Sequence, residues 1–119
     1  MHLKFLFTQF STFFYLSEPP MISPFSFDSE IESGRDAQLV CYVPQGDAPL
    51  TITWYFHGRD VSHVMGVNTM KVGARSSILS ITSATHGHSG VYTCVAANKA
   101  GEKRHSASLV VHGRSPMQQ

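Results

Sequence analysis

The chain has 119 residues, which is enough for one domain with a hydrophobic core and too short for several. Hydrophobic residues make up 42% of it, which excludes an intrinsically disordered chain. Charged residues make up 14% and the net charge is +1, so the chain is too neutral to offset the phosphates of a nucleic acid. We therefore expect one globular domain that binds neither nucleic acid nor another partner mainly through charge.

The first 18 residues differ in character from the rest. Lys4 precedes an apolar run over 5–16, as in a secretory signal peptide, and this run is too short to span a bilayer. Polar residues interrupt the run, and small residues are poorly placed for cleavage. The alternative is that this stretch is sequence translated from just upstream of an exon. Either way we exclude 1–18 from the fold and predict a domain over 19–112, followed by a linker over 113–119.

The remaining sequence has no segment with a helical period, but short runs alternate between apolar and polar residues, which is an all-β pattern. The predicted strands lie at 37–43, 50–56, 68–72, 76–81, 91–97 and 107–111. The side chains expected to face inward are Leu39, Cys41, Val43, Ile52, Trp54, Phe56, Tyr92, Cys94, Ala96, Ala107, Leu109 and Val111. In the weaker strand at 68–72 we place Met70 and Val72 inward, and Thr69 and Lys71 outward.

Cys41 and Cys94 are the only two cysteines, and they are too far apart for a CxxC redox or zinc motif. The spacing favours a long-range disulfide. Such a bond would remove about 4 kcal/mol of unfolded-chain entropy in the usual loop-closure model, and it implies an extracellular compartment. The alternative is two buried free thiols in an intracellular domain.

The residues Cys41, Trp54, Leu79, Tyr92 and Cys94 lie on successive alternating runs. This set resembles the immunoglobulin fold, which has an inter-sheet disulfide, a tryptophan packed against it and a tyrosine two residues before the second cysteine. The resemblance implies a two-sheet sandwich with Greek-key topology. It also implies that Trp54, Leu79 and Tyr92 belong to the core.

The segments CVAANKAG at 94–101 and SSILSI at 76–81 are similar to the I-set subclass, in which Asn98 and Gly101 would form the turn between the last two strands. Together with PPMISPFSF, GDAPLTITW and HSGVYTC, they resemble the Down syndrome cell adhesion molecule (Dscam) family. The likeness is to the alternatively spliced seventh immunoglobulin domain of arthropod members and to the first domain of the shortened members of chelicerates. It covers nearly the whole chain after Pro20.

His88 stands where many members of this family have an aspartate that pairs with an arginine near the start of the fourth strand. The corresponding stretch here, 66–68, has no arginine. An aspartate would be an unpaired charge, so a neutral polar residue costs less free energy, and we interpret His88 as a structural replacement. We expect His86 and His88 to be solvated loop residues. No third metal ligand lies nearby in the sequence, and nothing indicates a pH switch.

The sequence contains no phosphate-binding loop, nucleophile elbow or zinc-protease motif. We therefore expect no enzymatic activity, no cofactor, no metal and no small-molecule substrate.

The outward side chains of 37–43 and 76–81 form the candidate binding surface, because these strands are neighbours in one sheet of an immunoglobulin sandwich. No N-x-S/T glycosylation signal occurs in the chain. An apolar patch with a polar rim is more often an interaction surface than an accident, while isolated exposed apolar residues are also normal. The predicted interface consists of Gln38, Val40, Tyr42, Ile78 and Ser80, with Lys71 at its rim.

The resemblance implies that this sheet binds an identical copy in an antiparallel arrangement, as variable Dscam domains do. The implied protein is a membrane-anchored receptor with neighbouring immunoglobulin domains outside the cell. One alternative is a heterophilic immune or axon-guidance receptor domain that uses the opposite sheet, where Tyr55, His57, Thr93 and Val95 point outward. Another is an intracellular domain of the muscle I-set kind with free thiols.

Overall fold

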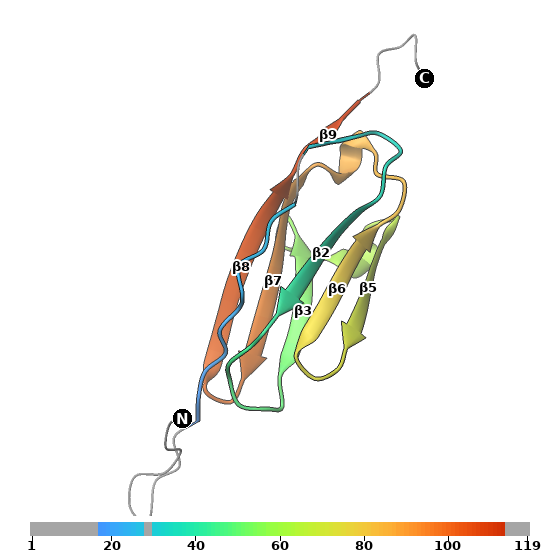
Figure 1. The fold of residues 1–119 in the computed structure, drawn as a ribbon. Helices are drawn as coiled ribbons and strands as arrows, with labels where there is room; N and C mark the ends of the chain where they lie inside the picture. The colour runs from blue at the N-terminus through green and yellow to red at the C-terminus, as the bar shows by residue number, and fades with distance from the viewer. Residues whose placement is uncertain (1–16, 28–29, 114–119) are drawn as a thin grey trace, which may run out of the picture.

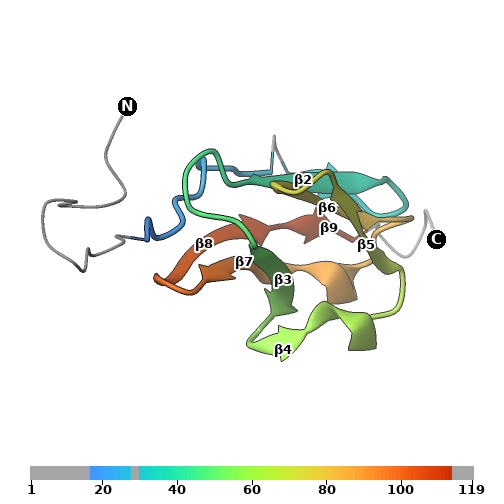
Figure 2. The ribbon, with the colours of Figure 1, turned by 90° about the horizontal axis from the view of Figure 1, so that it is seen from below.

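The computed structural model describes residues 17–27 and 30–113, which form two β-sheets packed face to face (Figures 1 and 2). The first sheet has the order β2–β6–β5, formed by Ala37–Tyr42, Ser76–Ile81 and Val67–Val72. The second has the order β4–β3–β7–β8, formed by Arg59–Asp60, Thr51–Phe56, Gly90–Asn98 and Gly101–Leu109. The predicted all-β sandwich is confirmed.

Short elements complete one end of the sandwich. Strands β1 (Ile31–Glu32) and β9 (Val111–His112) pair in parallel, and the 3-10 turns η1 (Val61–His63) and η2 (His86–His88) lie in the connections. Among the described residues no helix is long and apolar enough to cross a membrane. The predicted leader lies almost wholly outside the described residues, but Glu18 is described, and its carbonyl oxygen accepts hydrogen bonds from Asn98 Nδ2 at 2.7 Å and Asp47 N at 3.0 Å.

The core lies between the two sheets, around a disulfide that joins β2 to β7. Cys41 and Cys94 are bonded, and both are fully buried. Trp54 is buried on β3, and its indole N–H donates to Ser77 Oγ on β6 at 3.0 Å. Leu79 is also fully buried. The predicted disulfide is therefore present, and the two sheets are further joined by a buried side-chain hydrogen bond that no spacing pattern indicated.

The last long strand begins six residues earlier than the sequence predicts. Strand β8 pairs with all of β7, from Asn98 opposite Gly101 to Gly90 opposite Leu109. Its polar first half lacks the apolar alternation of a half-buried strand, so its pairing depends on the hairpin turn. In that turn Asn98 Oδ1 accepts from Ala100 N at 2.8 Å and Gly101 N at 3.2 Å, which confirms the predicted role of Asn98 and Gly101.

The first described segment changes sheets at Pro24. Ser23 N donates to Tyr42 O at 2.9 Å, so the chain at first runs beside β2. Proline has no N–H to continue such a ladder. The backbone nitrogen and oxygen of Phe25 instead lie 3.2 and 2.9 Å from His105 Nε2 on β8. The first half of β2 consequently has no described strand on its outer edge.

Tyr92, the tyrosine two residues before the second cysteine, lies in the core as predicted. It is fully buried, and its hydroxyl donates to His88 O at 2.7 Å. Burial raises the pKa of this hydroxyl from 10.0 to about 12. Tyr92→Phe should lower the free energy of unfolding by about 1 to 3 kcal/mol, because a buried carbonyl loses its donor. Chemical denaturation at pH 7 measures this change, and Tyr55→Phe on the outer side of β3 is the matched control.

The raised pKa of the Tyr92 hydroxyl predicts that the fold loses stability at alkaline pH. Between pH 10 and about 12 the unfolded chain releases the Tyr92 proton while the folded chain keeps it, so the contribution is complete below pH 10 and is lost as the pH rises. The free energy of unfolding should fall by about 1.4 kcal/mol per pH unit over this interval. Denaturation midpoints measured at several pH values should show a smaller fall for Tyr92→Phe, and an equal fall in both proteins would contradict the assignment.

Candidate recognition face

The strands β2, β6 and β5 place nine side chains on the outer side of their sheet. Residues paired directly across an antiparallel ladder point to the same side, so the pairings define three rows. These rows are Gln38–Ser80–Asn68, Val40–Ile78–Met70 and Tyr42–Ser76–Val72. We call these nine residues the recognition face.

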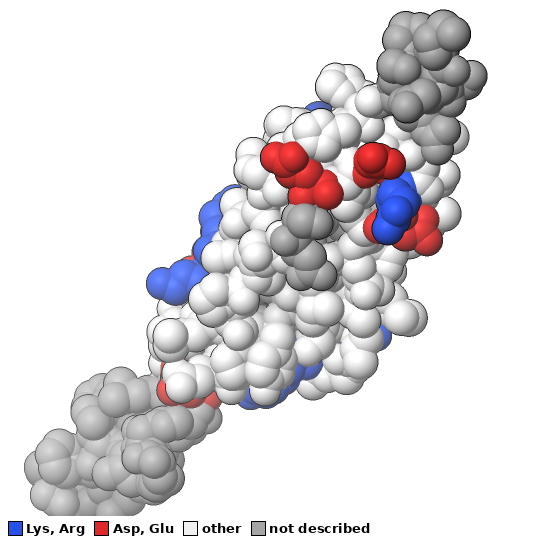
Figure 3. Space-filling view, turned by 45° about the horizontal axis from the view of Figure 1, so that its top comes forward, with Lys and Arg blue, Asp and Glu red and all other residues white. Residues whose placement is uncertain are grey.

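None of the nine side chains of the recognition face is charged. Figure 3 shows this in a space-filling view, in which the area over the three strands is white and the red and blue groups lie at its ends and margins. Several large apolar groups are exposed there: Val40 at 45%, Tyr42 at 46%, Met70 at 61% and Val72 at 46%. Solvent thus contacts a continuous apolar strip that polar but neutral side chains flank.

The predicted orientation of β5 is wrong. Met70 and Val72 are paired with Ile78 and Ser76 and lie on the outer side, whereas Lys71 is opposite Ser77, whose side chain is buried. Lys71 Nζ lies 3.5 Å from Leu50 O, away from the recognition face, so its predicted place at the rim is wrong as well. Strand β5 lies at the edge of the sheet, where side chains on both sides are exposed and burial does not select an orientation.

The other predicted interface residues lie together on the recognition face. Gln38, Val40 and Tyr42 are exposed, and Ile78 and Ser80 are half-buried between their neighbours on β2 and β5. Gln38 Nε2 donates to Ser80 Oγ at 3.4 Å. Four further residues of this face were not among those predicted from the sequence: Asn68, Met70, Val72 and Ser76. The alternation of 76–81 was sufficient to find Ser76, but no signal in the sequence indicated the three residues of β5.

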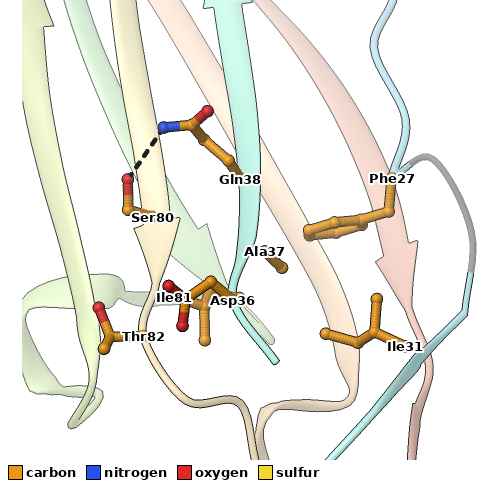
Figure 4. Close-up of a pocket in the computed structure, with 8 residues that line it drawn as sticks. All are labelled: Phe27, Ile31, Asp36, Ala37, Gln38, Ser80, Ile81 and Thr82. Carbon is orange, nitrogen blue, oxygen red and sulfur yellow. Dashed lines mark hydrogen bonds between the residues drawn. The ribbon is translucent and has the colours of Figure 1, made fainter. Parts of the chain in front are cut away.

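A groove of about 510 Å³ lies beside the recognition face, where the first segment separates from β2 (Figure 4). Figure 4 shows Phe27 and Ile31 pointing toward Ala37 from the segment opposite β2. Polar side chains form its other wall. The lining consists of Phe27, Ile31, Asp36, Ala37, Gln38, Ser80, Ile81 and Thr82.

His88 is buried rather than solvated, with 7% of its surface exposed, while His86 in the same turn is exposed. Thr85 N donates to His88 Nδ1 at 2.9 Å, so the proton of the neutral ring is on Nε2, which lies 2.7 Å from Met65 O. Gly66 leaves room for the ring, since a Cβ there would lie 3.2 Å from Nε2. The neutral side chain of His88 therefore connects η2 to the segment that leads into β5.

On the opposite sheet, three of the four residues that the alternative hypothesis uses are buried or half-buried, and His57 is exposed. Val95 faces outward between Thr53 and Arg104 but is only 6% exposed. Tyr55 and Thr93 are half-buried, and Thr93 Oγ1 lies 2.7 Å from Ser106 Oγ. Val91 on the same face is 40% exposed, so this sheet also presents an apolar group to solvent.

No group of three or more His, Cys, Asp or Glu side chains in the described ranges is placed to hold a metal ion. The two cysteines are bonded to each other, so the described part of the chain contains no free thiol of the kind that the intracellular alternative requires.

The family model of the immunoglobulin domain matches residues 19–98. The chain therefore belongs to the immunoglobulin-domain family. Its relatives place it more narrowly: it is 41% identical over 93 residues to cell adhesion molecule Dscam2 of Drosophila melanogaster and 38% identical over 93 residues to human DSCAM. Each alignment covers 78% of this chain and 4% of the relative, so the chain spans a small part of these proteins.

The solved structures agree with this assignment. A crystal structure of the Dscam1 Ig7 domain, isoform 5, is 37% identical, has a TM-score of 0.77 and aligns over 81% of this chain and 99% of its own. The chain is an immunoglobulin domain of the Dscam family, as its sequence motifs predict.

The contacts of His88 predict that an aspartate at this position destabilises the fold. His88→Asp removes the donor to Met65 O and buries a carboxylate near that carbonyl, so the free energy of unfolding should fall by about 2 to 3 kcal/mol. Urea denaturation followed by tryptophan fluorescence measures the change. The control is His86→Asp on the same turn, which should change stability by no more than about 0.5 kcal/mol. Equal stability of the two variants would contradict the structural role of His88.

Proposed function

We propose that this chain is an extracellular recognition module of a Dscam-type cell adhesion molecule, and that it binds an identical copy of itself through the recognition face. The observation that carries the proposal is the absence of charge from nine exposed or half-buried side chains around an apolar strip. Exposed apolar patches rimmed by polar groups mark interaction sites. The module acts by binding, not by catalysis.

Three further features support this function. Relatives of the chain are cell adhesion molecules by name. The Cys41–Cys94 disulfide suits an oxidising, extracellular compartment. The described chain enters the sandwich at one end and leaves it at the other, as Figure 1 shows, which suits a domain in a linear series with neighbouring immunoglobulin domains of a membrane-anchored receptor.

The layout of the recognition face suits a symmetric pair. If two copies pack face to face with antiparallel strands, their two-fold axis lies in the interface and crosses the strands. Each strand then lies over the same strand of the second copy. The rows run in the opposite order, so the row of Gln38 lies over the row of Tyr42. With the axis on the middle row all three rows are matched, and Val40, Ile78 and Met70 each meet the same residue of the second copy.

An uncharged symmetric face makes self-recognition sensitive to small changes. Each substitution occurs twice in a pair of identical copies, and a new charge is buried twice without a partner. Isoforms that differ at these rows would therefore bind each other less well than themselves. We expect a single pair of domains to bind weakly and many copies on apposed membranes to supply avidity.

Met70→Glu tests the recognition face, because Met70 is its most exposed apolar residue and lies on the expected axis. The wild-type chain should dimerise in sedimentation equilibrium at micromolar concentrations and neutral pH. Met70→Glu should weaken the dimer at least a hundredfold, since two carboxylates then meet at the axis.

The matched control is Thr53→Glu, an exposed position on the opposite sheet. It should leave the dimer unchanged. A wild-type chain that stays monomeric at these concentrations, or a dimer that Thr53→Glu disrupts and Met70→Glu does not, would refute pairing through this face.

A further inference from the structure

The groove beside β2 has an apolar floor and a polar wall with a free acceptor. Phe27, Ile31 and Ala37 supply the apolar side. Asp36 is exposed in the polar wall, and only its Oδ1 is engaged in a described hydrogen bond, with Ser83 N at 2.8 Å. Because a carboxylate has two acceptor oxygens, Asp36 is able to accept a further hydrogen bond from a group in the groove. A flat apolar group with a terminal donor is the chemistry that fits.

The recognition face presents one such group, Tyr42, at the opposite end of β2. This residue is 46% exposed, and its side chain projects from the outer side of the sheet. A tyrosine combines an apolar ring with a hydroxyl that requires a partner when it is buried. Within one copy Tyr42 is six residues along the strand from Asp36, about 20 Å at 3.4 Å per residue, so the two side chains of one copy do not meet.

Symmetry brings the two groups together between copies. In the antiparallel pair described above β2 lies over β2, and the row of Tyr42 lies over the row of Gln38. Gln38 lines the groove, and Asp36 is two residues further along the strand, about 7 Å away. Because packed sheets lie about 10 Å apart, the two backbones would be about 12 Å apart, a distance that a tyrosine side chain, a hydrogen bond and an aspartate side chain together span. The strands of two packed sheets cross at about 30°, and this angle displaces one β2 strand along the other by less than about 7 Å.

We propose that in the self-pair the groove of each copy receives the Tyr42 ring of the other, with the Tyr42 hydroxyl donating to the Asp36 carboxylate. This inference rests on the proposed self-recognition through the same face. It adds two equivalent contacts, one at each end of the interface, and makes residues 36 and 42 a specificity-determining pair. The middle row supplies apolar contact, and this pair selects the partner by size and by hydrogen bonding.

A charge-exchange experiment tests the contact. In Tyr42→Glu two carboxylates meet at each end of the pair, so this homodimer should be at least a hundredfold weaker than wild type. In Asp36→Lys each tyrosine loses its acceptor, so this homodimer should be at least tenfold weaker. A mixed pair of the two variants contains one wild-type Tyr42–Asp36 contact and one new ion pair between the introduced glutamate and the introduced lysine. It should therefore bind at least tenfold more tightly than either homodimer.

Sedimentation velocity with a fluorescent label on the Tyr42→Glu variant measures the mixed pair at neutral pH. Glu32→Lys is the matched control, because Glu32 is another exposed acid at the same end of the domain but lies on β1. A mixed pair of Glu32→Lys and Tyr42→Glu should bind no more tightly than the stronger of the two homodimers. Asp36→Asn keeps an acceptor for Ser83 N and checks that replacing the carboxylate leaves the fold intact, by its thermal midpoint.

The outcomes separate this inference from the proposed function. A wild-type chain that never dimerises overturns both. If the wild type dimerises, Met70→Glu is monomeric and the mixed pair binds no more tightly than the stronger homodimer, the face pairs but the Tyr42–Asp36 contact is refuted. A gain that Glu32→Lys reproduces also refutes it, since the gain then reflects overall charge. Tighter binding of Tyr42→Glu to Asp36→Lys, but not to Glu32→Lys, supports the contact.

Discussion

The disulfide between Cys41 and Cys94 determines which side of β2 faces the core, and the orientation of the other strands follows from it. Because both sulfur atoms lie between the sheets, Leu39 and Val43, two residues before and after Cys41, are buried as well. Gln38, Val40 and Tyr42 must then face solvent. Strand β6 pairs with β2 and β5 with β6, so the same constraint extends over three strands and creates the recognition face.

Polar contacts join the elements at the end of the sandwich where η2 lies. Tyr92 donates to the backbone of His88, and the His88 ring in turn lies between Thr85 and Met65. Strand β7, the connection between β6 and β7, and the connection that leads into β5 are thereby joined through neutral groups. No buried side-chain polar atom among the described residues lacks a partner. A neutral imidazole avoids the desolvation cost of a buried ion pair. We regard this as the physical reason why the turn at 86–88 accommodates a histidine.

The absence of charge on the recognition face has two opposite consequences. It removes the repulsion that would arise wherever a charged residue met its own copy, so the face is compatible with a symmetric pair. It also removes long-range attraction, so association depends on shape and apolar contact. Discrimination between similar copies then requires a few residues whose mismatch is costly, and positions away from the axis are suited to this because they meet a different residue.

Alternating runs and the cysteine spacing in the sequence indicated an all-β chain, a long-range disulfide and the outward side of β2 and β6, because a buried strand of period two leaves a local pattern. The resemblance to immunoglobulin domains added the sandwich and the core positions Trp54, Leu79 and Tyr92. The orientation of β5, the burial of His88 and the groove at Asp36 depend on the folded chain and were not predictable from local patterns. Strand β5 lies at an edge where burial does not select a side, while His88 and the groove depend on segments that are distant in sequence. The chain encodes locally which residues leave the water, and the packing of remote segments decides which exposed and polar residues meet.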